Sequence, residues 1–245
     1  MPIFKKHQFM EKVLAFLRGL EENNNKEWFD AHRKQYIEAK NIFSSFVTEL
    51  IDGIAAFDPS VKGLGVNDCT YRIHKDMRFS RDGLPYKTHF GAFVARGGKK
   101  SGYSGYYFHI GTGSGDSYPR SNLLASGNYY TEPRVLKILR EDIELGGGDF
   151  DDIIRNRVDQ RMTLDRDQVL KKVPAGFPAD SPYAEYLKLK NFCLSYEFDD
   201  TLLMSPGMLP AVLEIFRTTR PFLDYINRAV DFSREENIGN VMIGF

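Results

Sequence analysis

The hydrophobic periodicity of the chain changes at about residue 70, and this change constrains the fold more than any other feature. Before it, apolar residues recur at helical spacing, as in Phe9, Met10, Val13, Leu14, Leu17 and Leu20. From Tyr71 onward, apolar and polar residues alternate as they do in strands. Helical and strand segments that come in separate blocks are typical of the α+β class.

The spacing predicts an antiparallel sheet packed by N-terminal and C-terminal helices. Two helical stretches, residues 9–20 and 28–54, flank the asparagine run Asn23–Asn25, which breaks the first helix and offers an N-cap for the second. A break is expected near Gln35. Short turn-rich spacers separate the expected strands, so an antiparallel meander over about residues 70–126 is favoured. These strands are Arg72–Asp76, His89–Ala95, Tyr103–Ile110 and Ser121–Ala125.

Helices return in the C-terminal half. A helix is expected from Thr131 to Gly146, where three consecutive glycines end it, followed by short helices over about 149–160 and 182–190. Phe192–Phe198 reads as a strand. Ser205-Pro206 predicts the start of a last helical region that reaches Arg228 and that Pro221 kinks or splits. With no repeat and no long linker, we expect residues 1–245 to form a single domain.

Composition excludes several functional classes. The chain has 33 basic and 33 acidic residues, so its net charge of zero gives no support to nucleic-acid binding. Two cysteines are too few for a disulfide framework and are compatible with a reducing cytoplasm. No apolar run approaches the roughly 20 residues that a membrane span needs. We therefore expect a cytoplasmic protein without membrane insertion, and the sequence leaves its oligomeric state open.

The most informative stretch is Val66–Lys100, which carries eight lysine or arginine residues and only three aspartates. The excess is offset in Glu141–Gln160, which has seven acidic and two basic residues. Basic side chains on strands and tight turns suit a small anion such as a phosphate or a carboxylate. The residues predicted to bind it are Arg72, Arg78, Arg81 and Lys87.

Three further residues in this stretch predict acid–base chemistry. Arg72 and His74 share a strand face, and Asp76 joins that face if the strand continues. His74, Asp76 and His89 are therefore the candidate catalytic groups. The competing interpretation is a salt-bridge network that only holds the turn together.

Other site types find less support. His74 and Asp76 with His89 or His109 would make a loose metal site, and we expect none because the cysteines are sparse. Gly111–Gly115 follows a strand but lacks the third glycine of a dinucleotide-binding loop. The sequence therefore leaves any cofactor unknown.

The segment from Arg78 to Phe90, R-F-S-x-D-x-x-P-Y-K-T-H-F, resembles the hallmark of a widespread bacterial family of conserved proteins of unknown function. Asn23–His32, Gly105–Ile110, Gly127–Pro133 and Ser205-Pro206 are similar to other parts of that family. The resemblance spans nearly the whole chain and implies no known activity. The leading hypothesis from the residues is a binding site for a small phosphorylated or carboxylated ligand, with or without turnover. The rival is a non-enzymatic interaction module that uses the basic turn against an acidic partner.

Overall fold

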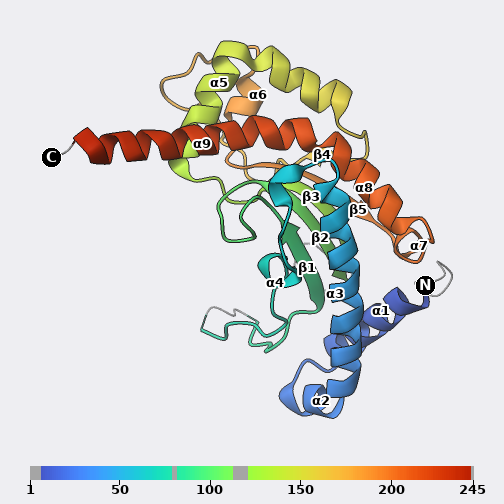
Figure 1. Cartoon of the computed structure of the whole chain (residues 1–245). Helices are drawn as coiled ribbons and strands as arrows, with labels where there is room; N and C mark the ends of the chain where they lie inside the picture. The colour runs from blue at the N-terminus through green and yellow to red at the C-terminus, as the bar shows by residue number, and fades with distance from the viewer. Residues whose placement is uncertain (1–6, 79–81, 113–120, 244–245) are drawn as a thin grey trace. The chain divides into compact units, whose positions relative to one another are not determined.

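The computed structural model describes residues 7–78, 82–112 and 121–243. Within them it has the α+β architecture that the sequence predicts, with helices and one antiparallel sheet (Figure 1). The backbone forms two compact units. The first takes in the chain up to Lys100 with Tyr107–Leu124 and Glu197–Glu214, and the second takes in Ser101–Tyr106, Ala125–Tyr196 and the chain from Ile215. That the whole chain is a single domain stays a prediction.

The described part of the sheet has five strands in the order β1-β2-β3-β5-β4. Their bounds are β1 His89–Val94, β2 Gly105–Gly111, β3 Asn122–Asn128, β4 Thr163–Leu164 and β5 Phe192–Phe198. The sequence predicts that the sheet ends near residue 126. This limit is wrong, because β5 is the neighbour of β3 in the sheet and β4 pairs with the other edge of β5. Phe192 and Leu194 are fully buried on β5, which explains why this late apolar segment joins the sheet.

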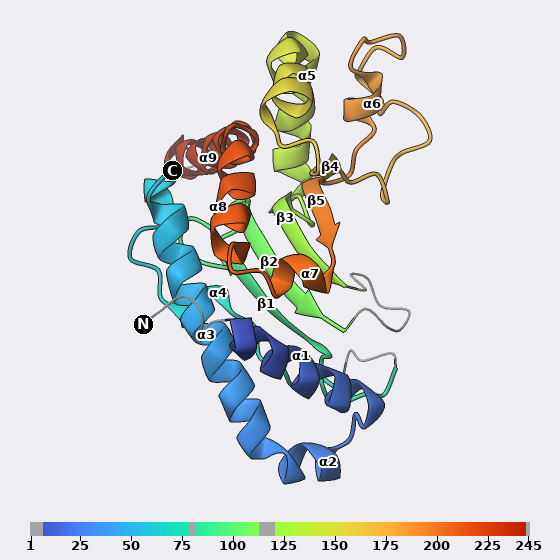
Figure 2. The same ribbon diagram turned by 90° about the vertical axis from the view of Figure 1, so that its right-hand side faces the viewer.

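In the first unit, helices cover one face of β1 and β2 (Figure 2). The helical elements are α1 His7–Glu22, α2 Lys26–Ala31, α3 Arg33–Ala55, η2 Pro59–Val61, α4 Val66–Cys69 and α7 Asp200–Leu203. Phe43 on α3 stacks on Phe90 of β1 with ring centroids 5.3 Å apart, and Phe46 contacts Phe108 of β2 at 4.6 Å. Asn25 caps α2 as predicted, since its side chain accepts a hydrogen bond from the Trp28 amide.

The predicted break in the second helical stretch lies at His32, slightly earlier than Gln35. A larger correction concerns Arg72–Asp76, which is not a strand of the sheet. This segment lies antiparallel to residues 86–92, which include the start of β1. Two isolated bridges join the two segments, Thr70↔Ala92 and His74↔Tyr86. Between the two bridges, the chain advances four residues from Thr70 to His74 and six residues from Tyr86 to Ala92. Because these lengths differ, a continuous ladder cannot form.

The second unit contains most of the C-terminal helices. These are α5 Pro133–Asp152, the π-helical turn η3 Ile153–Arg157, α6 Ala184–Leu187 and α9 Arg220–Ile243; α8 Met208–Thr218 begins in the first unit. The aromatic ring of Phe150 lies at its centre, within 6.0 Å of the Tyr186, Phe192, Phe222 and Tyr225 rings. The split at Pro221 is confirmed, because α8 ends at Thr218 and α9 begins at Arg220.

Four predicted helix bounds are wrong. α5 does not end at the glycine run: it kinks at Gly146 and continues to Asp152. A Cβ on Gly147 would lie 2.7 Å from the Tyr183 ring, so this glycine serves close packing and not helix termination. The expected helix at 149–160 is divided between α5 and η3, and the one at 182–190 shrinks to α6. The last region begins at Met208 and passes Arg228 to reach Ile243.

None of the helices in the described ranges is long and apolar enough to cross a membrane.

Asn24 ties the loop between α1 and α2 to the chain ahead of β1. Its side-chain amide donates to the Tyr86 carbonyl at 3.0 Å, and its side-chain oxygen accepts from the Tyr86 amide at 3.1 Å. We predict that Asn24→Ala lowers the free energy of unfolding by roughly 1–3 kcal/mol, as expected for two partly buried hydrogen bonds. Chemical denaturation measures this. Asn156→Ala, which removes one exposed bond to Asp152, is the control and should stay within about 0.5 kcal/mol. Equal losses of unfolding free energy in the two variants would contradict a stabilising role for the Asn24–Tyr86 hydrogen bonds.

Candidate functional site

The predicted site residues divide between the two faces of the paired segment ahead of β1. His74 lies on the helical side, where its ring meets Phe29 edge-on at 5.5 Å and Tyr86 at 5.1 Å. Phe29 in turn stacks on Tyr86 at 4.1 Å. His74 is thus part of an aromatic group with α2, on the side to which Phe90 also points.

Lys87 and His89 point to the other side, because side chains alternate along an extended chain. The His89 ring stacks on that of His109 from β2 at 4.5 Å, and the Lys87 ammonium lies 5.5 Å from the centre of the Tyr71 ring. We call this group the lysine–histidine cluster. It consists of Tyr71, Lys75, Lys87, His89, Tyr107 and His109.

His109 is the most enclosed member of the cluster, with no exposed surface. Its Nδ1 lies 3.0 Å from the Tyr107 hydroxyl, while Nε2 has no hydrogen-bond partner in the described structure. Two glycines make room for these rings: a Cβ on Gly111 would lie 2.8 Å from His109 Nε2, and one on Gly91 would lie 2.5 Å from the Tyr107 hydroxyl. A buried polar nitrogen without a partner costs about 1–3 kcal/mol, and such unmade bonds are often found at functional sites.

The cluster holds both imidazoles in the neutral form. Burial, followed by the charges of Lys87 and Lys75, lowers the pKa of His89 to about 4. Burial and then His89 lower the pKa of His109 to about 2. The pKa of Lys87 is itself lowered, first by burial and then by Arg72 and Lys75. At neutral pH, the cluster therefore joins uncharged histidines to crowded positive charges.

The turn that follows contains ion pairs of the kind that the salt-bridge interpretation predicts. Arg78 forms a bidentate pair with Asp76 through distances of 3.0 and 2.7 Å, and hydrogen bonds from the Arg78 side chain and backbone lower the pKa of Asp76. Lys75 reaches the Asp82 carboxylate at 2.6 Å. Both pairs are at least partly exposed, so their contribution to stability is small.

Arg72 and Lys87 differ from these paired cations. Among the described residues, no carboxylate lies within 4.0 Å of either one, although the charge of Arg72 contributes to the lowered pKa values of Lys87 and Asp76. Arg72 is exposed and Lys87 is half-buried. Arg81, the remaining predicted ligand-binding residue, lies outside the described residues.

The structure therefore brings Lys87 and His89 together, pairs Asp76 with Arg78, and separates His74 from His89. Since His74 and His89 lie on opposite sides, they cannot share one metal ion, and the described residues contain no group of three potential ligands that could hold one. The absence of a metal stays a prediction. Sequence reasoning missed Lys75 and Tyr71 as neighbours of His89; the signal was their spacing of four residues, which places both on the same face of an extended chain.

A family model described as "Conserved hypothetical protein (DUF2461)" matches residues 12–225. The chain belongs to this family. The match includes all the residues of the lysine–histidine cluster and all the predicted site residues. No curated protein and no solved structure matches the chain. The resemblance inferred from the sequence is thus confirmed at the level of the family, whose function is unknown.

The electrostatics of the cluster predict a measurable pKa change. We expect Lys87→Gln to raise the pKa of His89, because removing a nearby positive charge favours the protonated imidazole. An NMR titration of the imidazole resonances measures this. Lys100→Gln, which removes an exposed charge from the same basic stretch, is the control and should leave the pKa of His89 unchanged. An unchanged pKa in Lys87→Gln would show that Lys87 does not face His89.

The same lowered pKa makes folding stability depend on pH. The unfolded chain takes up a proton at His89 near its usual pKa of about 6.5, whereas the folded chain does so only near 4. The stability present above pH 6.5 is therefore lost as the pH falls toward 4. We expect His89→Gln to show a smaller loss of melting temperature than the wild type over this range in a thermal-unfolding series. A loss of equal size would contradict the assignment.

Proposed function

We propose that the chain binds a small phosphorylated or carboxylated ligand at the lysine–histidine cluster. The supporting observation is the Lys87 ammonium, which is half-buried, crowded by Arg72 and Lys75, and without a carboxylate in ion-pair reach among the described residues. An anion placed there would relieve both the burial cost and the mutual repulsion of the cations. Lys87 is the principal cation in this proposal and Arg72 the second.

Arg78 has a smaller part in the proposal than the sequence alone would give it. Two of its N–H groups already bind Asp76, and the charge of that carboxylate offsets the charge that a ligand would meet at Arg78. The proposed anion contact therefore rests on Lys87 and Arg72, and the assignment of Arg81 stays a prediction.

His89 is the best-placed acid–base group of the three candidates. It lies beside Lys87, whereas His74 faces the aromatic side and Asp76 binds Arg78. A bound anion would raise the pKa of His89 from about 4 toward its usual value, so that the imidazole could hold a proton next to the ligand. Turnover at this site would use that proton, and in this proposal it is an extension of ligand binding.

A specific observation also favours the rival function. Three large apolar side chains around the basic turn are exposed: Tyr71 by 43%, Met77 by 49% and Leu84 by 40%. Apolar side chains interspersed with Arg72 and Arg78 are typical of a surface that meets an acidic protein partner.

Isothermal titration with inorganic phosphate tests the first proposal. We expect Lys87→Gln to weaken binding roughly ten- to a hundredfold, the effect of losing one charge-assisted hydrogen bond. Lys87→Arg should keep part of the affinity, and Lys100→Gln should keep all of it. Equal affinities in the wild type and Lys87→Gln would contradict the proposal. Binding of poly-glutamate but not of phosphate or citrate would favour the interaction module.

A further inference from the structure

The second unit has a cavity of about 240 Å³ that none of the predicted site residues lines. Pockets for drug-sized ligands have volumes of roughly 300–1,000 Å³, so this cavity suits a smaller molecule. It is lined by Gly102, Ser104, Asn128, Tyr130, Thr131, Glu132, Val135, Ile226, Val230 and Arg234.

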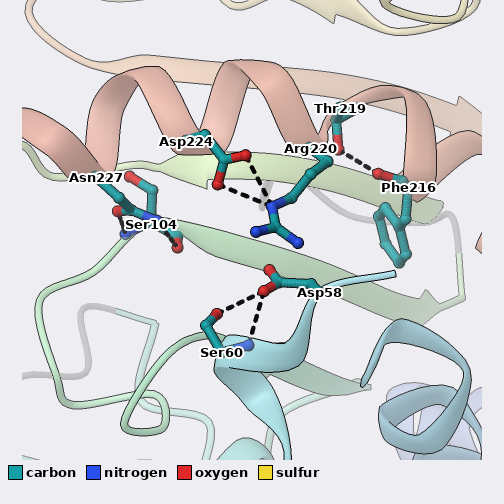
Figure 3. Close-up of polar contacts among 8 residues, drawn as sticks. All are labelled: Asp58, Ser60, Ser104, Phe216, Thr219, Arg220, Asp224 and Asn227. Carbon is teal, nitrogen blue, oxygen red and sulfur yellow. Dashed lines mark hydrogen bonds and ion pairs between the residues drawn. The ribbon is translucent and has the colours of Figure 1, made fainter. Parts of the chain in front are cut away.

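Two residues of the cavity lining have buried hydroxyl groups without hydrogen-bond partners in the described structure. Ser104 is 3% exposed and Thr131 is 8% exposed, and neither side-chain oxygen has a partner in the described structure. Ser104 is held in place by Asn227, whose side chain accepts from its amide at 2.9 Å and donates to its carbonyl at 3.1 Å (Figure 3). A fixed, buried hydroxyl without a partner is well suited to bind a polar group of a ligand.

Opposite charges also line this cavity. The Arg234 guanidinium lies over the Tyr103 ring, 4.2 Å from its centre, and one of its nitrogens donates to the Ser101 carbonyl. A guanidinium has five N–H groups, and among the described residues only this one hydrogen bond engages those of Arg234. Glu132 lies immediately before α5. In the described part of the chain, neither Arg234 nor Glu132 has an oppositely charged side chain within 4.0 Å.

The remaining wall is apolar. Val135, Ile226 and Val230 line it, and two of them, Ile226 and Val230, lie one turn apart on α9. A ligand that satisfies every wall carries an anionic group, a cationic group and a small apolar part within one compact molecule.

We propose that this cavity binds a zwitterionic small molecule of the size of an amino acid. Its carboxylate lies against the Arg234 guanidinium, and its ammonium lies against the Glu132 carboxylate. The Ser104 and Thr131 hydroxyls complete its hydrogen bonds, and its side chain packs on Val135, Ile226 and Val230. This site is independent of the anion proposed at Lys87.

Titration calorimetry of the full chain with three matched probes tests this proposal. The probes are leucine, 4-methylpentanoate, which lacks the amino group, and 3-methylbutylamine, which lacks the carboxylate. We expect leucine to bind at least about tenfold more tightly than either analogue. Equal binding of all three would overturn the proposal, as would the absence of binding by leucine, glycine, serine and glutamate at about 10 mM.

Variants separate the two charges. Arg234→Gln should weaken leucine about tenfold or more and leave 3-methylbutylamine unchanged, while Glu132→Gln should weaken leucine and leave 4-methylpentanoate unchanged. Glu141→Gln, an exposed change on the same helix α5 outside the cavity, is the control and should have no effect. Because Glu132 is exposed, its variant keeps the test valid if Arg234→Gln lowers stability. Loss of leucine affinity in Lys87→Gln would overturn the independence of the two sites.

Discussion

The alternation of side chains through β1 and the residues just before it determines how the chemistry of the first unit is arranged. Phe90 must point to the helical layer to stack on Phe43, and this direction sends His89 to the opposite side. The Lys87 side chain points to the same side as that of His89. The Tyr86 side chain points to the same side as that of Phe90, where it contacts Phe29 and His74. One packing requirement thus divides a basic motif into an aromatic half and a polar half.

The polar half depends on this division, because burial makes its charges interact strongly. The His89 and His109 rings are stacked, and both are neutral at pH 7, chiefly because burial lowers their pKa values; the charges of Lys87 and Lys75 add to this effect at His89, and His89 adds to it at His109. The exposed ion pairs of the turn, Arg78 with Asp76 and Lys75 with Asp82, are screened by solvent and mainly hold the loop. Among the described cations of this region, the half-buried Lys87 therefore has the most to gain from a bound anion.

Much of the fold was predictable from periodicity, whereas the arrangement of the site was only partly so. The bounds of β5, the Asn25 cap and the split at Pro221 follow from local patterns, which act over a few residues. The Gly146 kink and the pairing of β5 with β3 depend on contacts between distant segments, such as Tyr183 over Gly147. Likewise, His89 and Lys87 could be singled out from the sequence, but their meeting with His109 and Tyr107 depends on the register between β1 and β2.

In the proposed site, an anion is held on the side of His89 and His109 and not on the side of His74. Imidazole NMR resonances followed during a titration with inorganic phosphate test it directly, because a charge changes the shifts of the rings that it approaches. We expect the His89 and His109 resonances to move together with a saturable dependence on phosphate, while those of His74 stay in place. Movement of His74 with His89 unchanged would contradict it.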